Sequence, residues 1–246
     1  ELRHMDRYSQ MALAAGLDAY HHAGLDPGSY PPDRIGVMIG TGAGGVTTLE
    51  TQIQTFHTRG ARRVSPVTVP MFIPNMASAE CSIRIHARGP GMGIASACAT
   101  GGHALALAAR LILSGDADCM LAGGVEACLT PFAVSAFASM RALSTRNDDP
   151  KAASRPFSAD RDGFVMSEGG GVLVLEDYDH ARARGARVLA LLEGSAMTQD
   201  AYHVVAPEPE GVAVVSAIER AISNAGIDKA DIGYINAHGT STQLND

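Results

Sequence analysis

The sequence is poor in charged residues, in cysteine and in long apolar runs, and each shortage excludes a class of protein. Charged residues make up only 18% of the 246 residues and the formal net charge is −7, which argues against non-specific binding of nucleic acid. The four cysteines form no C-x-x-C pair, so their spacing predicts neither a metal site nor a disulfide framework and favours a reducing compartment, the cytoplasm. No apolar run reaches the roughly 20 residues that span a bilayer, and no signal-peptide pattern is present. We therefore expect neither a membrane nor a nucleic acid as a partner.

What the sequence does contain is 46% hydrophobic residues and 27 glycines, which indicate a compact α/β protein with many tight turns. Helical periodicity and capping residues predict helices at 6–24, 46–58, 75–86, 99–113, 178–184 and 211–225. Short apolar runs predict buried strands at 35–40, 92–97, 118–125, 172–176, 188–194 and 232–237. Strands of this kind separated by helices are typical of a parallel sheet covered on both faces. The polar, turn-rich residues 144–163 predict a long ordered loop, a feature that is usually functional.

Two segments far apart in the chain resemble each other. Residues 23–42 and 225–240 both begin with the end of a predicted helix, which reads Ala-Gly-Leu-Asp in the first segment and Ala-Gly-Ile-Asp in the second. In both, a turn, a predicted strand and a loop of glycine and threonine follow. Chance similarity between two ordinary αβ units is one explanation, and internal duplication is the other. Under duplication, the loops at Thr41 and at His238 are counterparts at the carboxyl ends of strands, where ligands of α/β sheets gather.

Cys98 lies where a predicted strand gives way to a predicted helix, in Ser-Ala-Cys-Ala-Thr-Gly-Gly. A cysteine in the first turn of a helix faces unpaired N–H groups and the positive end of the helix dipole, and both favour the nucleophilic thiolate over the thiol. A small buried hydrophobe is the alternative interpretation, because free cysteines usually fill that role.

His238 is the second candidate, because it comes directly off a predicted strand in Asn-Ala-His-Gly-Thr-Ser-Thr. Small and hydroxyl-bearing neighbours would let its ring face a cleft and admit a ligand. Acyl transfer by a Cys–His arrangement requires the two side chains to meet, and two duplicated halves packed together would bring Cys98 and His238 near each other.

Several motifs, in this order along nearly the whole chain, closely resemble the β-ketoacyl-acyl carrier protein synthases of the thiolase superfamily, especially the type II condensing enzymes of fatty-acid synthesis. These motifs are Gly-Pro at 89–90 leading to Ser-Ala-Cys-Ala-Thr-Gly at 96–101, Gly-Asp-Ala-Asp at 115–118, Ala-Gly-Gly-Val-Glu at 122–126, Arg-Ala-Leu-Ser at 141–144, Ala-Ser-Arg-Pro-Phe at 153–157, Arg-Asp-Gly-Phe-Val at 161–165, Asp-Ala-Tyr-His at 200–203 and Asn-Ala-His-Gly-Thr-Ser-Thr at 236–242.

The resemblance implies a layered αβαβα thiolase-like fold, a homodimer and a decarboxylative Claisen condensation with acyl and malonyl thioesters. Cys98 would accept the acyl group, and His238 would be one of two histidines that stabilise the enolate oxygen. Thr240 and Thr242 would bond the pantetheine arm, and Phe137 would line the mouth of the site, with plain core packing as its alternative. No cofactor or metal is implied, since the substrates are carried on the phosphopantetheine of acyl carrier protein.

The resemblance also implies a basic rim that meets the acidic carrier protein, formed by Arg62, Arg63 and Arg141, with Arg3 as a further member. In a chain of net charge −7, such a local positive patch would steer an acidic partner. Solvated surface charge is the alternative. Asp200 and Glu168 are weaker candidates for the polar network behind the histidines, and Asp200 is equally consistent with a turn cap.

The motifs of the family extend beyond those in this sequence. We therefore expect the chain to be cut at both ends and to cover roughly the middle three-fifths of such an enzyme. The family's second histidine, its lysine and its gating loop would lie beyond residue 246. We expect residues 1–246 to form part of a single ketosynthase domain, with a first half at about 1–175 and the start of a second half at about 176–246.

Other functions stay open from the sequence. A ketosynthase of a polyketide system shares these motifs, and a truncated, non-catalytic fragment that binds carrier protein would share them too. A thiolase acting on coenzyme A esters is disfavoured by the Asn-Ala-His-Gly-Thr motif, and a chain-length-factor subunit by the presence of Cys98.

Overall fold

The computed structural model describes residues 2–246, which form two compact units. The first unit contains the residues up to Thr130 together with Ser167–Ala190, and the second contains Pro131–Met166 together with Leu191–Asp246. Among residues 2–246, no helix is both long and apolar enough to cross a membrane.

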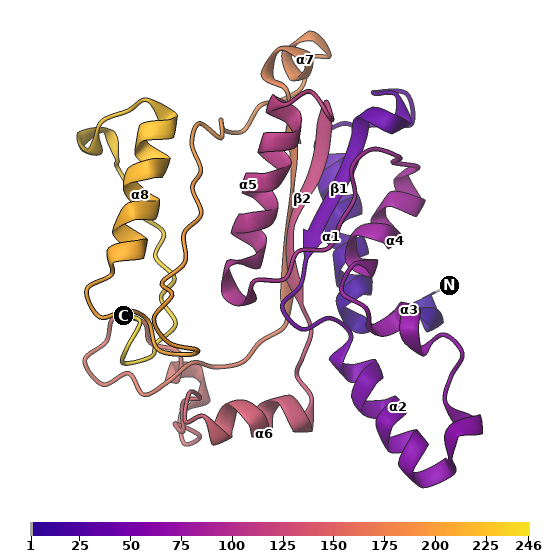
Figure 1. The fold of residues 1–246 in the computed structure, drawn as a ribbon, viewed down its shortest axis with the longest axis vertical. Coiled ribbons are helices and arrows are strands. Elements are labelled where there is room, and N and C mark those ends of the chain that lie inside the picture. Colours follow the sequence, from indigo (N-terminus) through magenta and orange to yellow (C-terminus); the bar gives the residue numbers. More distant parts are fainter. Residues whose placement is uncertain (1) are drawn as a thin grey trace. The chain divides into compact units, whose positions relative to one another are not determined.

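A three-stranded sheet lies at the centre of the first unit (Figure 1). Strands β1 (Ile35–Gly40) and β2 (Cys119–Glu126) are parallel, with Ile35 opposite Cys119. Strand β3 (Gly169–Glu176) runs antiparallel to β2, so the expectation of a purely parallel sheet is wrong at this strand. The reason is the path of the chain, which leaves β2 and enters β3 at the same edge of the sheet, where Glu126 pairs with Gly169, instead of crossing back over a face.

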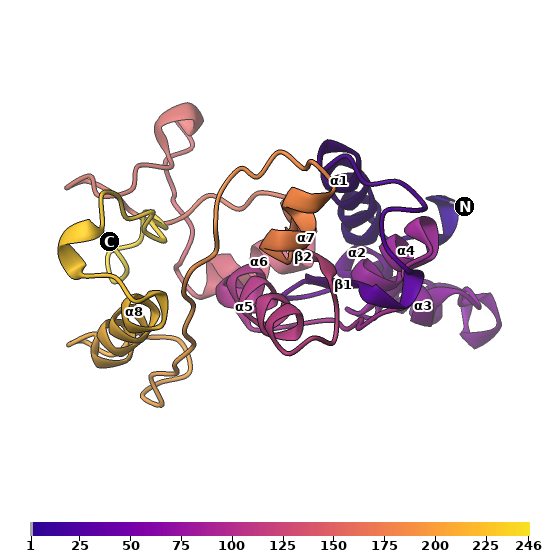
Figure 2. The ribbon, with the colours of Figure 1, turned by 90° about the horizontal axis from the view of Figure 1, so that it is seen from above.

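Helices cover both faces of this sheet, as Figure 2 shows from above. Helices α1 (Arg7–His22) and α4 (Met76–Ile85) pack on one face, and α5 (Thr100–Leu113) packs on the other. Alternate residues of β1 therefore enter different cores, Val37 and Ile39 the first and Met38 the second, and all six residues of the strand are buried. The first unit is thus a helix–sheet–helix sandwich.

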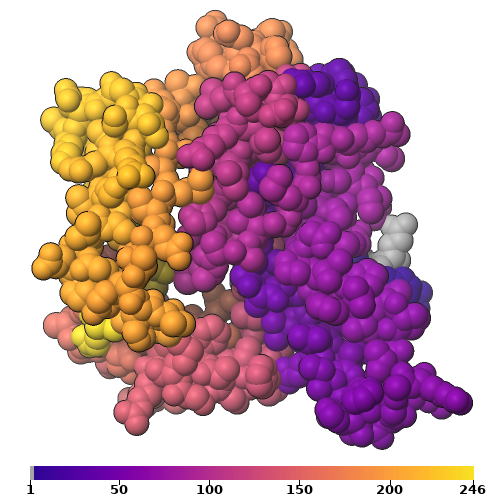
Figure 3. All heavy atoms as spheres, viewed as in Figure 1, coloured from indigo at the N-terminus to yellow at the C-terminus, as the bar shows by residue number. Residues whose placement is uncertain are grey.

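The remaining helices of the first unit are α2 (Val46–Arg59), α3 (Thr68–Phe72) and α7 (Tyr178–Ala183), with 3-10 turns at Leu2–His4, Pro32–Arg34, Ala61–Arg63 and Ala97–Ala99. In Figure 3, α2 and the turn that follows it project from the body of this unit. The second unit contains α6 (Pro131–Ser139) and α8 (Val212–Ala225), with 3-10 turns at Pro150–Ala152 and Lys229–Asp231. The six predicted helices are confirmed, whereas α3 and α6 were not predicted.

The predicted strand at 92–97 is wrong, because only one bridge, from Gly91 to Val37, forms beside β1. The cause is Ser78, whose hydroxyl occupies the backbone positions that a further strand would use. It accepts the N–H of Ile39 at 2.8 Å and donates to the carbonyl of Met92 at 2.8 Å. A side chain thus replaces part of a β-ladder at this edge of the sheet.

The strands predicted at 188–194 and 232–237 are also wrong, since neither segment forms a strand in the described part of the chain. A strand exists only with a hydrogen-bonded neighbour. Their apolar residues stay open to solvent, with Leu189 67% exposed and Tyr234 81% exposed. The polar segment 144–163 is a loop as predicted, interrupted only by the turn Pro150–Ala152.

Candidate active site

Cys98 lies in the 3-10 turn Ala97–Ala99, which runs directly into α5. Its side chain is solvent-exposed and its thiol is free. The other three cysteines differ: Cys81 and Cys119 are buried in the first unit and Cys128 is half-buried. Burial raises the pKa of the Cys81 thiol to about 12 and also raises the pKa values of Cys119 and Cys128. Cys98 is therefore the accessible thiol of the described chain.

The turn that carries Cys98 is held by the first turn of α5. Ala97 has a φ of +49°, a left-handed conformation that is unfavourable for a residue with a Cβ atom. The hydroxyl of Thr100 accepts the N–H of Ser96 at 2.8 Å and donates to the carbonyl of Ala97 at 2.7 Å. One helical turn further on, His103 Nδ1 lies 2.7 Å from Ser96 Oγ. His103 thus also contacts the turn that carries the cysteine.

The carboxyl ends of β1 and β2 meet beside this turn, and Glu126 joins them. Its carboxylate accepts hydrogen bonds from the Thr41 hydroxyl at 3.0 Å and from the N–H groups of Gly42 and Ala43 at 2.9 and 3.2 Å. A Cβ atom at Gly42 would stand 2.8 Å from this carboxylate and 3.7 Å from the Cα of Ala97. The loop after β1 is therefore packed between Glu126 and the segment that presents Cys98.

Glycine lets α5 approach the sheet at this point. A Cβ atom at Gly124 would stand 3.1 Å from the Cα of Gly101, and one at Gly40 would stand 2.3 Å from the methyl group of Thr100. The backbones of the helix and of β2 thus come close without an intervening side chain. The start of α5 lies at the carboxyl edge of the sheet (Figure 1). Cys98, in the turn directly before α5, is thereby fixed at this edge.

His238 lies in the second unit and is solvent-exposed. The residues after it form a compact loop around the carboxylate of Asp246. That carboxylate accepts the N–H groups of Ser241 at 2.9 Å and of Phe157 at 3.0 Å, and Ser241, with a φ of +67°, is fully buried. The hydroxyls of Thr240 and Thr242 lie 2.9 Å apart and are half-buried.

The long loop 144–163 is tied to this segment. Arg161 donates from Nε to the carbonyl of Thr242 at 3.1 Å, and from Nη2 to the carbonyls of Gln243 and Asp246 at 3.3 and 3.0 Å. Ser241 adds two bonds, accepting the N–H of Arg155 on its hydroxyl and the N–H of Gly163 on its carbonyl. The loop therefore serves as the scaffold of the segment that follows His238.

The structure describes Cys98 in the first unit and His238, Thr240 and Thr242 in the second, so their meeting in one site stays a prediction. Phe137 packs edge-to-face on Phe164, with ring centroids 5.5 Å apart.

The arginines predicted to form the basic rim are all exposed. Arg62 and Arg63 lie in the turn Ala61–Arg63 of the first unit, and Arg141 follows α6 in the second.

The two weaker candidates have local partners. Asp200 accepts the N–H of Glu208, eight residues further along the chain, at 3.0 Å. Glu168 is paired with Arg7 and accepts the N–H of Leu129 at 3.3 Å. Sequence reasoning overlooked Thr100, Glu126 and Arg161. Thr100 carries a visible signal, since a threonine directly before an apolar helical run marks the start of a helix.

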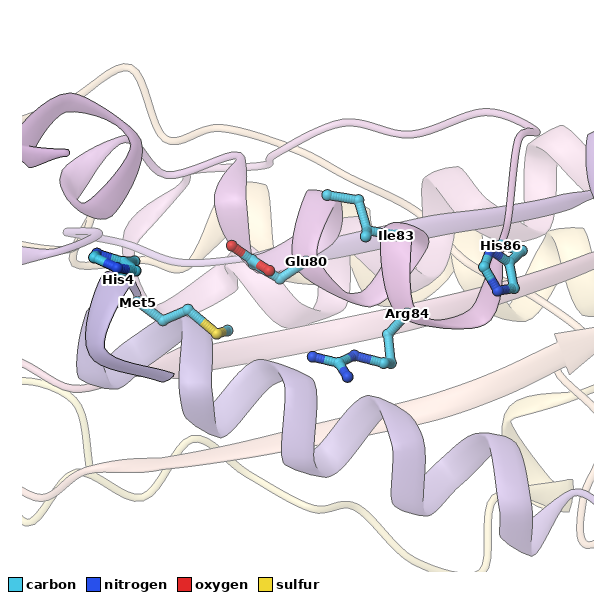
Figure 4. Close-up of a pocket in the computed structure, with 6 residues that line it drawn as sticks. All are labelled: His4, Met5, Glu80, Ile83, Arg84 and His86. Atoms are coloured by element: carbon cyan, nitrogen blue, oxygen red, sulfur yellow. The ribbon is translucent and has the colours of Figure 1, made fainter. Parts of the chain in front are cut away.

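A separate hollow of about 500 Å³ lies beside α4 (Figure 4). It is lined by residues from the start of the chain and from α4 and its end: His4, Met5, Glu80, Ile83, Arg84 and His86. None of the candidate site residues contributes to it.

The layered sheet with an exposed cysteine between its carboxyl edge and a helix N-terminus defines a thiolase-like α/β protein. Residues 1–181 match the N-terminal domain of beta-ketoacyl synthase, and residues 189–246 match the C-terminal domain. The chain belongs to the beta-ketoacyl synthase family, which confirms the expected resemblance and fold class.

Relatives and solved structures agree with this assignment. The chain is 46% identical over all 246 residues to a 3-oxoacyl-[acyl-carrier-protein] synthase 2 of Vibrio cholerae, and 47% identical to one of Staphylococcus aureus. It spans 59% and 61% of the lengths of these two relatives.

Solved structures with the same fold include the following two. One is a type II polyketide ketosynthase in complex with its acyl-carrier protein, with a TM-score of 0.93 at 36% identity over 98% of this chain and 60% of that one. The other is a beta-ketoacyl synthase from Burkholderia phymatum, with a TM-score of 0.90 at 35% identity over 100% of this chain and 60% of that one.

Proposed function

We propose that this chain is part of a β-ketoacyl-acyl carrier protein synthase that extends acyl chains in fatty-acid synthesis. The observation that carries the proposal is an exposed cysteine at the start of α5, in a chain 46–47% identical over its whole length to enzymes named 3-oxoacyl-[acyl-carrier-protein] synthase 2.

The proposed reaction has two stages. The Cys98 thiolate attacks the thioester carbonyl of acyl-carrier protein, forms an S-acyl bond, and releases the carrier's thiolate, which takes up a proton. Malonyl-carrier protein then loses CO2, and the electron pair left on its α-carbon attacks the acyl-Cys98 carbonyl. The Cys98 thiolate leaves, and the product is β-ketoacyl-carrier protein.

Each stage develops negative charge on an oxygen, which donors placed in advance stabilise. The N–H of Cys98 is proposed as one donor to the tetrahedral intermediate, and such a donor is worth about 3 kcal/mol. His238 is proposed to stabilise the enolate oxygen formed on decarboxylation. The exposure of its ring supports this role, because the ring is open to a substrate.

Thr240 and Thr242 are proposed to hydrogen-bond the pantetheine arm. Their half-buried hydroxyls lie 2.9 Å apart on a loop anchored by Arg161. This fixed pair of hydrogen-bonding groups supports the binding of an extended polar ligand. Phe137 is proposed to line the mouth of the acyl site.

Acyl carrier protein is the proposed protein partner, bound by Arg62, Arg63 and Arg141. Exposed cations on a chain of net charge −7 support steering of an acidic partner, and one similar ketosynthase is described in complex with its acyl-carrier protein. We further propose a cytoplasmic homodimer in which this chain forms part of one ketosynthase domain.

A ketosynthase of a polyketide system is the second candidate, favoured by the TM-score of 0.93 to such an enzyme. The identity of 36% to that enzyme, against 46–47% to the synthase 2 relatives, ranks it lower.

Acyl transfer to the full chain tests the proposal. We expect hexanoyl-carrier protein to add one hexanoyl group, located at Cys98 by peptide mass spectrometry. Cys98→Ala should abolish the adduct and Cys128→Ala, the matched control, should keep it. A folded wild-type sample without the adduct, or an adduct that survives in C98A, contradicts the proposed role of Cys98.

A further inference from the structure

Thr100, the first residue of α5, contacts the cysteine turn at two points. Its hydroxyl bonds the N–H of Ser96 and the carbonyl of Ala97, so the two bonds lie on either side of the Cα of Ala97. The residue is only 4% exposed. Bulk water therefore does not compete for these bonds.

The residue between the two bonds is strained. Ala97 has a φ of +49°, and a residue with a Cβ atom keeps such a conformation only where its surroundings hold it. We propose that Thr100 is a positioning residue for Cys98. Its hydroxyl holds Ala97 in the left-handed conformation, and this fixes where the Cys98 thiol stands at the start of α5. The proposal rests on the proposed role of Cys98 as acyl acceptor.

A second contact from the same helix supports this assignment. His103 lies three residues after Thr100, on the same face of α5, and its Nδ1 lies 2.7 Å from Ser96 Oγ. Two side chains of the first turn of α5 thus contact Ser96 and Ala97, Thr100 at both residues and His103 at Ser96. Cys98, the next residue along, follows whatever conformation these contacts impose.

The two parts of the Thr100 side chain can be tested separately. Its methyl group fills the space beside Gly40, where a Cβ atom would come within 2.3 Å of it, whereas only its hydroxyl bonds the cysteine turn. Thr100→Val keeps the shape and the methyl group but removes both hydrogen bonds. Thr100→Ser keeps the hydroxyl but loses the buried methyl group.

The readout is the rate at which iodoacetamide alkylates Cys98 in the full chain at pH 7, followed by peptide mass spectrometry. We expect T100V to react roughly tenfold more slowly, because a thiol no longer held at the start of α5 loses the unpaired N–H groups that favour the reactive thiolate. T100S should keep the wild-type rate even though it loses packing. A T100V rate equal to wild type overturns the proposal, and so does a T100S rate as low as that of T100V.

A rescue experiment isolates the strain. Glycine adopts positive φ without a steric penalty, so Ala97→Gly combined with T100V should restore the alkylation rate. The double variant also carries the test if T100V alone does not fold, as judged by circular dichroism. A double variant that fails to fold, or that folds and reacts slowly, overturns the proposal, because Thr100 would then serve the fold and not the strained residue.

Alkylation does not require acyl transfer, so the two hypotheses fail separately. A wild-type chain that is alkylated at Cys98 but takes no acyl group from the thioester contradicts the proposed function. The comparison of T100V with T100S still decides the role of Thr100 in that case.

Discussion

The carboxylate of Glu126 and the hydroxyl of Thr41 are joined by a hydrogen bond of 3.0 Å that links the end of β2 to the end of β1. The same carboxylate bonds two N–H groups of the loop after β1, so one side chain closes the sheet edge beside Cys98. Three donors on one carboxylate make this a costly contact to lose.

Glu126→Ala should therefore lower the free energy of unfolding by about 2–3 kcal/mol, since hydrogen bonds to a charged group contribute more than neutral ones. Glu126→Gln should cost less, because its carbonyl still accepts the N–H groups and its amide donates to Thr41. Urea denaturation followed by circular dichroism measures both. Asp18→Ala, on the exposed side of α1, is the control and should stay within about 0.5 kcal/mol of wild type. An E126A value within that range would show that the carboxylate contributes nothing to stability.

Thiol accessibility gives a second prediction. In the native chain, iodoacetamide at pH 7 should label Cys98 first and leave Cys81 and Cys119 unlabelled, because these two are buried and burial raises their pKa values. In urea all four cysteines should react. Peptide mass spectrometry reads the order, and native labelling of Cys81 at the rate of Cys98 would contradict the described core.

The ion pair of Arg34 and Asp118 predicts a pH dependence. Hydrogen bonds from Arg34 lower the pKa of Asp118, with Nη2 at 2.6 Å and Nε at 2.9 Å from its carboxylate oxygens. A lowered pKa in the folded state means stability that is present above the unfolded value of about 3.9 and is lost as the pH falls through the folded value.

Asp118→Asn should accordingly be less stable than wild type at pH 7, and the difference should shrink below about pH 4. Urea denaturation at pH 7, 5, 4 and 3 measures it, with Asp18→Asn as the control. A difference that does not change between pH 7 and pH 3 would rule out a charge-dependent contribution from this pair.

The contact between β2 and β3 leaves no room for a side chain at Gly123. A Cβ atom there would stand 2.0 Å from the carbonyl oxygen of Gly171, whereas a Cβ atom at Gly171 meets nothing within 4 Å. Gly123→Ala should cost about 3 kcal/mol, and Gly171→Ala, in the facing strand, should be neutral or stabilising by up to about 1 kcal/mol. Thermal unfolding compares the two, and equal melting temperatures would contradict the strand register.

Local pattern was sufficient to predict the elements that carry Cys98. The Ala- and Leu-rich run after Thr100 marks α5, and the apolar runs of β1 and β2 mark strands buried on both faces. What pattern could not predict depends on distant partners. Ser78 takes the place of a strand at Ile39. The direction of β3 depends on where the chain returns to the sheet after the long segment between Glu126 and Gly169.

The candidate site divides in the same way. Motifs single out Cys98 and His238, but the contacts of Glu126 join residues about 85 positions apart and leave no periodic trace. The strain at Ala97 is a property of its backbone dihedral angles. The presence of an alanine in the sequence does not predict such a conformation. The role of His238 beside Cys98 stays a prediction.

Arg161 holds the segment after His238 through three main-chain carbonyls, those of Thr242, Gln243 and Asp246. Every residue has a main-chain carbonyl group, so these bonds from Arg161 do not depend on the side chains of the segment. A substitution at position 240 or 242 removes the bond between the two hydroxyls but leaves the bonds from Arg161 in place. The main chain of this segment therefore has an anchor that tolerates a change of side chain.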